Sequence, residues 1–311
     1  MRVVSVVFVL GLVVLVAAGC NSTRWGFLHH DDKDKLAKPD NGKAPTVAAL
    51  VDYMNDNAGR IKSVQCNSLE VTCAQGVERI NLHGKMVAEK PRGFRMSLDG
   101  PLGFSQVADL GSNSDEFWFW IKPQPGQKMQ SYQYYCSYKD LEKGVGFIPI
   151  PFQPDWIMEA MGLGPYGPAD RYQIETDDKT QMIRLIEKSR SPQGTPVRKV
   201  IVMHRREKKA PEPQITHFIL IDDTTNQEIC SAHIQQTMVD KATGAILPRK
   251  LDLNWRQENA TLSLVMDRTA VNVAVPPRAF VRTPLNGVQS YNLALRQPDS
   301  GVQAIQGFGP K

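Results

Sequence analysis

Residues 80–98 read INLHGKMVAEKPRGFRMSL, and this stretch decides the fold class. Apolar residues alternate with polar ones from Ile80 to Ala88 and again from Phe94 to Leu98, on either side of a Lys-Pro-Arg-Gly turn. Such alternation is typical of half-buried antiparallel strands. Similar runs separated by turn residues predict that one long antiparallel sheet continues through 104–110, 117–121, 129–138, 172–176, 182–187, 197–204, 215–221, 228–239, 246–255 and 261–268.

Two segments have a helical pattern instead. Apolar residues between positions 47 and 58 recur at the helical period, after a suitable N-cap at Thr46. A short apolar helix is expected over 156–161, capped by Asp155. The predicted fold class is therefore mainly β (α+β), with one helix before the sheet and a short helical insertion midway.

The composition is that of a globular protein. The 311 residues are 41% hydrophobic and 22% charged, which excludes wholesale disorder and fibrous rods. The net charge is +5, and the chain has no long basic block, so nucleic acid is not an expected partner.

The N-terminus has the features of an export signal. Arg2 precedes an apolar run from Val3 to Ala18, and small residues come directly before Cys20. The run is short for a spanning helix, and its small-residue end favours cleavage. The segment resembles a bacterial lipoprotein signal, which implies that diacylglycerol is attached to Cys20 and anchors the mature chain in a membrane. An ordinary signal peptide with Cys20 as a plain thiol is the alternative. Asn21 favours the outer membrane, because inner-membrane retention signals carry Asp there.

The segment after the anchor is polar and is expected to be a disordered tether. His29, His30, Asp31 and Asp32 in it could ligate a metal ion, but nothing preorganises them, so we expect no metal site and no cofactor. The expected organisation is a signal peptide (1–19), a tether after lipidated Cys20 (20–44), a single sheet domain (45–282) and a weakly ordered tail (283–311).

No catalytic motif is found. The chain lacks H-E-x-x-H, G-x-S-x-G, P-loop and G-x-G-x-x-G sequences. Asp109, Asp115 and Glu116 could supply a glycosidase pair of carboxylates, although acids near a turn are more often simply solvated. We therefore expect a protein that is not an enzyme.

Four cysteines besides Cys20 suggest disulfides in an oxidising compartment. A Cys66–Cys73 pair would need a turn at residues 67–68, because on one strand they would lie roughly 23 Å apart. Otherwise each cysteine would pair with a neighbour in the sheet, and the candidates are Cys66, Cys73, Cys136 and Cys230.

The order of these segments resembles the LolA/LolB lipoprotein-localisation superfamily. The resemblance rests on the first helix, on LHGKM at 82–86, on KPRGFRM at 90–96, on GPLG at 100–103 and on the ending LP, W and PPRAF at 247–248, 255 and 276–280. It covers roughly residues 45–280. It implies a curved, unclosed half-barrel whose concave side is covered by helices and holds acyl chains. It also implies that Leu102 is exposed and contacts the membrane. The greater length, the extra cysteines and the tail depart from that pattern.

Aromatic patterning is consistent with an apolar hollow. Residues 117–121 read FWFWI and are apolar on both faces, so one face must pack on something other than water. Either the helices fill the hollow as an ordinary core, or a ligand occupies it. The candidate cavity and lid residues are Phe94, Met96, Phe117, Trp118, Phe119, Trp120, Tyr132, Tyr134, Trp156, Ile157, Met158 and Met161.

Two functional hypotheses follow. In the first, a lipid-anchored protein of the bacterial envelope, facing the periplasm, binds acyl chains or lipoproteins in the hollow. In the second, a structural or regulatory envelope lipoprotein has a filled core and binds a protein partner. A hydrolase of envelope polymers is disfavoured by the missing motifs.

Overall fold

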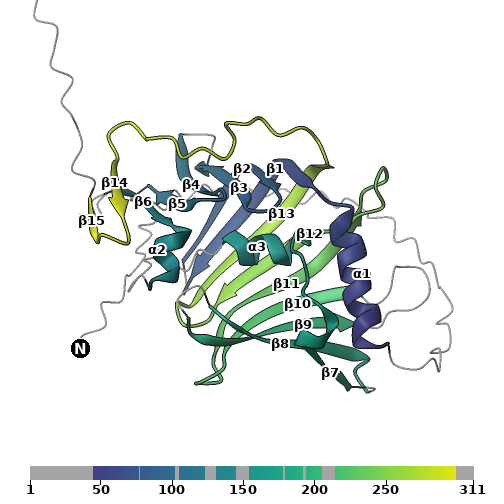
Figure 1. The fold of residues 1–311 in the computed structure, drawn as a ribbon. Coiled ribbons are helices and arrows are strands. Elements are labelled where there is room, and N and C mark those ends of the chain that lie inside the picture. Colours follow the sequence, from purple (N-terminus) through teal and green to yellow (C-terminus); the bar gives the residue numbers. More distant parts are fainter. Residues whose placement is uncertain are drawn as a thin grey trace, which may run out of the picture.

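The computed structural model describes residues 45–76, 78–101, 105–122, 131–144, 154–177, 179–191, 194–204 and 214–298. Cys20, the tether and Leu102 lie outside these residues. Within them the chain forms one sheet of fifteen strands, in the order β15-β14-β6-β5-β4-β3-β2-β1-β13-β12-β11-β10-β9-β8-β7 (Figure 1). The strands are β1 (Ser63–Gln75), β2 (Glu78–Glu89), β3 (Gly93–Asp99), β4 (Gln106–Ser112), β5 (Glu116–Ile121), β6 (Tyr132–Ser137), β7 (Tyr172–Asp177), β8 (Met182–Arg190), β9 (Pro196–His204), β10 (Gln214–Asp222), β11 (Glu228–Val239), β12 (Ile246–Trp255), β13 (Ala260–Val271), β14 (Gln289–Asn292) and β15 (Gln297–Pro298).

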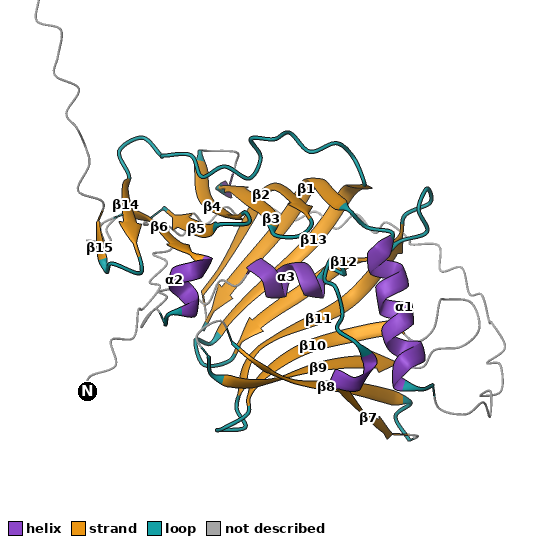
Figure 2. Ribbon diagram, in the orientation of Figure 1, coloured by secondary structure: helices purple, strands orange, loops and turns teal. Residues whose placement is uncertain are grey.

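The sheet is curved and does not close. Its end strands, β7 and β15, each pair with one neighbour only. The helices α1 (Val47–Gly59) and α3 (Pro154–Ala160) lie across one face, and α2 (Tyr138–Glu142) follows β6 (Figure 2). The predicted unclosed antiparallel half-barrel is confirmed, except that the β6–β14 pair is parallel.

The first helix forms as its sequence predicts. The Thr46 hydroxyl accepts a hydrogen bond from the Ala49 amide at 3.2 Å, which caps the helix. Leu50, Val51 and Met54 form its buried face. Helix α3 begins two residues earlier than expected, and α2 was not predicted from the sequence.

The predicted tail is wrong in its first part. Residues 289–292 and 297–298 form β14 and β15, and β14 extends the sheet beyond β6. Leu293 packs into the main core, so this segment contributes apolar burial that its weak pattern did not indicate.

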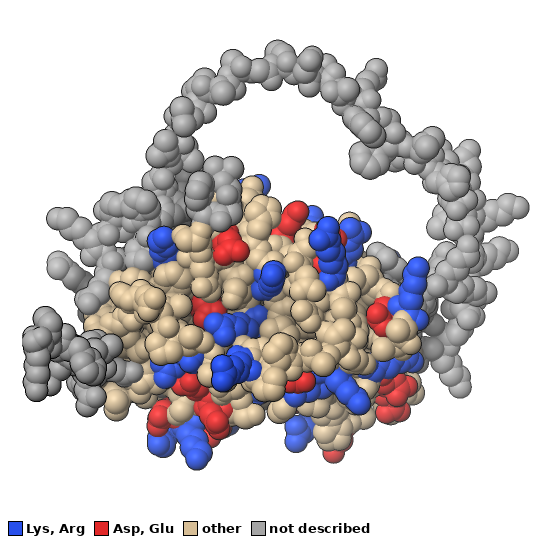
Figure 3. Space-filling model, turned by 90° about the horizontal axis from the view of Figure 1, so that it is seen from above, with Lys and Arg blue, Asp and Glu red and all other residues tan. Residues whose placement is uncertain are grey.

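Most of the core lies between the sheet and the helices. It contains Phe94, Met86, Leu69 and Leu185 from the strands together with Met161 after α3, all less than 2% exposed. Acidic and basic side chains are interspersed over the described surface seen in Figure 3, which fits the mild net charge.

Candidate functional site: an apolar groove beneath the first helix

A cavity of about 40 Å³ lies between α1, the segment after α3, and strands β10 to β12. Its volume has room for a few water molecules and is much smaller than an acyl chain. The surrounding side chains are mostly apolar, and they are Tyr53, Met54, Asn57, Ala160, Met161, Gly162, Tyr166, Ile215, Phe218, Ile234, Thr237, Ile246, Leu247 and Pro248. We call this cavity and its lining the groove.

Two asparagines on α1 fasten the helix to both sides of the groove. The Asn57 side chain accepts a hydrogen bond from the Ile246 amide at 2.8 Å and donates one to the Ile246 carbonyl at 2.9 Å. Asn55 likewise accepts from the Tyr166 amide at 3.1 Å and donates to the Tyr166 carbonyl at 3.3 Å. Each side-chain amide therefore forms hydrogen bonds with both the N–H and the C=O of one backbone residue, as the backbone of a neighbouring strand would.

The C-terminal end of α1 has two further polar contacts. Lys90 donates a hydrogen bond to the Ala58 carbonyl at 2.6 Å, and Arg60 donates one to the Gly244 carbonyl at 3.0 Å. The cation of Lys90 thus satisfies one of the last carbonyls of the helix, and its partial burial lowers its pKa. The polar contacts described above join residues 55–60 to the rest of the protein, and the buried face of the first half of α1 packs through Leu50, Val51 and Met54.

Helix α3 is held by an ion pair at each end. Asp155 contacts Arg92 at 3.1 Å, and Glu159 contacts Lys199 of β9 at 2.8 Å. Burial raises the pKa of Asp155, although the Arg92 charge opposes this. Burial by itself lowers the pKa of Lys199, but the carboxylates around it outweigh burial and raise it. A carboxylate near each end of α3 therefore pairs with a cation, one on the β2–β3 turn and the other on β9.

The sequence-predicted cavity residues are dispersed. Of them, Met161 lines the groove. The others that face the concave side are packed into the main core, and they are Phe94, Met96, Phe117, Phe119, Trp156, Ile157 and Met158. Much of the expected hollow is therefore filled by the protein's own side chains.

The assignment of Trp118 and Trp120 to the cavity is wrong. Residues along a strand alternate between faces, and Phe117 and Phe119 occupy the core side of β5. Trp118 and Trp120 therefore point to the outer face. Trp118 is 0% exposed there, and a Cβ on Gly111 would lie only 2.3 Å from its indole. The second apolar face of β5 is thus a second packed layer.

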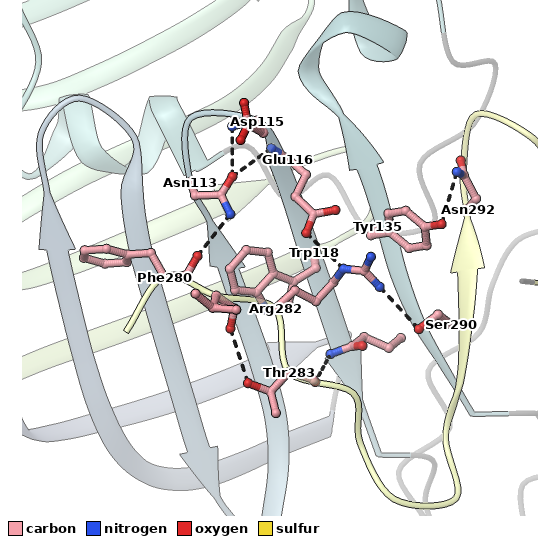
Figure 4. A network of polar contacts seen from close by, with 12 residues as sticks. Asn113, Asp115, Glu116, Trp118, Tyr135, Phe280, Arg282, Thr283, Ser290 and Asn292 are labelled. Atoms are coloured by element: carbon pink, nitrogen blue, oxygen red, sulfur yellow. Dashed lines mark hydrogen bonds and ion pairs between the residues drawn. The ribbon is translucent and has the colours of Figure 1, made fainter. Parts of the chain in front are cut away.

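Residues 279–283 cover this outer face (Figure 4). Asn113 donates a hydrogen bond to the Phe280 carbonyl at 3.0 Å, and Gln133 donates one to the Thr283 carbonyl at 3.0 Å. Arg282 binds Glu116 at 3.1 Å and lies 3.7 Å over the Tyr135 ring. We call residues 279–283 the strap.

The candidate carboxylates have structural roles. Asp109 is fully buried, binds Arg95 at 2.9 Å and accepts a hydrogen bond from the Trp118 indole at 3.2 Å. The expectation of a solvated turn acid is therefore wrong for Asp109. Glu116 forms an ion pair with Arg282, so two of the three proposed acids are paired with arginines.

Tyr132 and Tyr134 lie away from the groove. They form a ring cluster with Tyr291 of β14, with centroids 5.3 to 5.8 Å apart. Phe119 stacks on Tyr134 at 5.2 Å.

The expected disulfides are absent, and the four described cysteines are free. Cys66 and Cys73 share β1, with a β-bulge rather than a turn after Cys66. Cys136 and Cys230 lie on β6 and β11, which are neighbours neither of β1 nor of each other. Burial raises the pKa values of Cys73 and Cys136 to about 11 and that of Cys230 to about 12, which keeps these thiols protonated.

Neither a metal cluster nor a spanning helix occurs in the described part of the chain. It contains no group of three or more His, Cys, Asp or Glu residues placed to hold a metal ion. None of its helices is long and apolar enough to cross a bilayer.

Two histidines stack on the outer face of the sheet. The rings of His217 in β10 and His233 in β11 stack 4.4 Å apart with planes 3° from parallel. Burial, followed by the neighbouring His233 charge, lowers the pKa of His217, while Glu228 opposes this shift. The folded state thus binds the His217 proton less readily than the unfolded state does, so this contribution to stability is present above the unfolded pKa and is lost on acidification.

We therefore expect His217→Gln to reduce the fall in unfolding free energy between about pH 7 and pH 5. Urea denaturation at several pH values measures the fall, and His83→Gln, at an exposed position in β2, is the control. A His217→Gln variant with the same pH dependence as the parent would contradict the assignment.

Comparisons with known proteins give likenesses of shape. No family model matches the chain, and no curated protein does. A DUF1329 family protein from Desulfovibrio piger has a TM-score of 0.49 at 10% identity, over 76% of this chain and 98% of its own. A putative outer membrane lipoprotein-sorting domain from Vibrio parahaemolyticus has a TM-score of 0.47 at 10% identity, over 74% of this chain and 95% of its own. A LolA superfamily protein from Nitrosomonas europaea has a TM-score of 0.44 at 9% identity, over 77% of this chain and 99% of its own.

Two of these structures carry the LolA or lipoprotein-sorting name that the sequence resemblance also gave. Their scores are too low to assign a function, which must be inferred from the groove itself.

Proposed function

We propose that this protein binds the acyl chain of a lipid or lipoprotein in the groove, and that α1 moves to admit it. The observation that carries the proposal is an apolar cavity closed on one side by a separate helix, whose buried face consists of apolar side chains. Ligand sites are commonly apolar clefts with a few polar groups at the rim, and Asn57 and Thr237 supply such groups here.

The energy of opening can be compared with that of burying an acyl chain. Moving α1 away breaks four amide–backbone hydrogen bonds, each with a net contribution of about 1 kcal/mol. Each methylene of a buried chain contributes about 0.8 kcal/mol, so about five buried methylenes offset the four hydrogen bonds. Further methylenes must replace the apolar contacts of Leu50, Val51 and Met54, so only long chains would be bound with net gain.

Titration of the Cys20→Ser chain with a fluorescent long-chain fatty acid tests the proposal. Ile234 lines the groove, and an indole at this position would occupy it, so Ile234→Trp is expected to weaken uptake by about tenfold or more. Gln235→Trp adds the same indole to the outer face of the same strand and is the matched control. The proposal fails if the parent takes up no fatty acid, or if Ile234→Trp binds as the parent does.

The small volume of the groove favours a second candidate. Because eight predicted cavity residues are core residues, the protein could act as a structural or regulatory lipoprotein that binds a partner protein. Mass spectrometry of the purified chain separates the two functions. A co-purified lipid supports the carrier, and no lipid together with no dye uptake supports the partner-binding protein.

We further propose that the protein is anchored through acylated Cys20 in the outer membrane of a bacterial envelope and faces the periplasm. The short apolar run and the small residues before Cys20 support this location. The proposed binding needs no catalytic group, so the protein would act without being an enzyme. Polymer cleavage that is lost in Glu116→Gln would instead support a hydrolase.

A further inference from the structure

Strand β7 leaves one edge of the sheet open. It is the last strand in the sheet order, pairs with β8 alone, and lies at the lower end of the sheet in Figure 1. Its register with β8 is continuous from Tyr172 to Asp177 and contains no bulge. Within the described part of the chain, no other segment forms backbone hydrogen bonds with residues 172–177. The outer edge of β7 therefore presents a row of backbone N–H and C=O groups.

This edge lacks the features that usually prevent strand addition. The six residues of β7 read YQIETD, without a proline or a lysine. The opposite edge of the sheet differs, because β15 has only two residues and ends at Pro298, which has no N–H to donate. The edge of β7 is thus a template for an added strand, and the edge of β15 is a poor one.

Symmetry restricts how a second copy could add its own β7. In an antiparallel pair related by a two-fold axis, one residue lies opposite itself, because opposite residues share a face of the sheet. An axis at Gln173 or Thr176 would pair only three residues of the strand, and an axis at Glu175 would place two carboxylates opposite each other. An axis at Ile174 pairs five residues and puts no like charges opposite each other.

The side chains fit the register centred on Ile174. Ile174 packs against the core, so its pairing with itself would continue the apolar layer from one copy to the next. At both ends of the pairing, Arg171 would lie opposite Asp177 of the second copy. Arg171 is 63% exposed and reaches Glu187 of its own chain only at 4.0 Å, so its charge can be shared with a new carboxylate.

We propose that two copies of this chain associate through β7, with the two-fold axis at Ile174, so that their sheets join into one. Backbone hydrogen bonds supply the attraction, and the Arg171–Asp177 pairs favour this register over its alternatives. None of the residues from 171 to 177 lines the groove, so the association does not depend on binding of an acyl chain.

Sedimentation equilibrium of the full mature chain carrying Cys20→Ser tests for the dimer. Arg171→Asp would place like charges opposite each other at both ends and is expected to weaken the dimer by about tenfold. Adding Asp177→Arg to that variant restores opposite charges and is expected to recover most of the loss. Arg249→Asp changes an arginine of similar exposure on β12, away from the edge, and should leave the dimer unchanged.

Thiol cross-linking tests the register itself. The proposed pairing places the two residues 174 about 5 Å apart between their Cβ atoms, and the two residues 176 about 13 Å apart. A short thiol cross-linker should therefore join chains that carry Ile174→Cys and should not join chains that carry Thr176→Cys, with the parent chain as background.

Circular dichroism checks that each variant is folded. A parent chain that stays monomeric at all concentrations, a dimer unchanged in folded Arg171→Asp, or equal cross-linking at positions 174 and 176 would each overturn the proposal. Fatty-acid uptake by a monomeric chain would still support the function proposed for the groove, so the two proposals fail separately.

Discussion

Replacing Asp109 by alanine is expected to lower the free energy of unfolding by about 3–5 kcal/mol. The carboxylate has no exposed surface, and it accepts hydrogen bonds from Arg95 at 2.9 Å and from the Trp118 indole at 3.2 Å. Its removal leaves the mostly buried Arg95 cation without its partner beneath the strap. Urea denaturation followed by tryptophan fluorescence measures the loss.

The matched control is Asp267→Ala. Asp267 pairs with Arg249 at 3.1 Å, but both side chains are about half exposed. Water and salt screen such a pair, so its loss should cost less than about 1 kcal/mol. Equal losses for the two variants would show that the Asp109 pair does not hold the outer layer.

The second large effect is expected from Cys20→Ser. If Cys20 is acylated, the serine variant loses its anchor and moves from the membrane fraction to the soluble fraction. Each buried methylene of the acyl chains contributes about 0.8 kcal/mol, so the change in partitioning is of many orders of magnitude. Cell fractionation and the intact mass of the protein measure it.

Cys73→Ser is the control for this variant. Cys73 lies within β1 and far along the chain from the apolar N-terminal run, so it is no candidate for the anchor. That variant should remain in the membrane fraction. A Cys20→Ser chain that still sediments with membranes at high salt would refute the lipid anchor.

The sequence predicted most elements because their signals are local. Alternation at 80–98 and the Thr46 cap depend on residues a few positions apart, and both elements form as expected. The five-residue helix α2 and the four-residue strand β14 are too short to produce such a pattern. The parallel pairing of β14 with β6 depends on residues about 150 positions away.

The site could be predicted only in part, because it is made by distant segments. The FWFWI stretch correctly indicated that both faces of β5 are buried. It could not indicate that the strap covers the outer face, since Phe280 is far away in the sequence. The groove likewise depends on Asn57 meeting Ile246, and an asparagine in an amphipathic helix gives no local signal of that contact.

Photo-crosslinking with a diazirine-labelled long-chain fatty acid tests the central claim most directly. The purified chain is irradiated with the ligand, digested, and the labelled peptides are identified by mass spectrometry. Binding in the groove predicts label on α1 around Tyr53 and Met54 and on the peptides that contain Phe218 and Ile234. Label spread over the outer face, or none above that of an unrelated soluble protein, would contradict the claim that the groove admits an acyl chain.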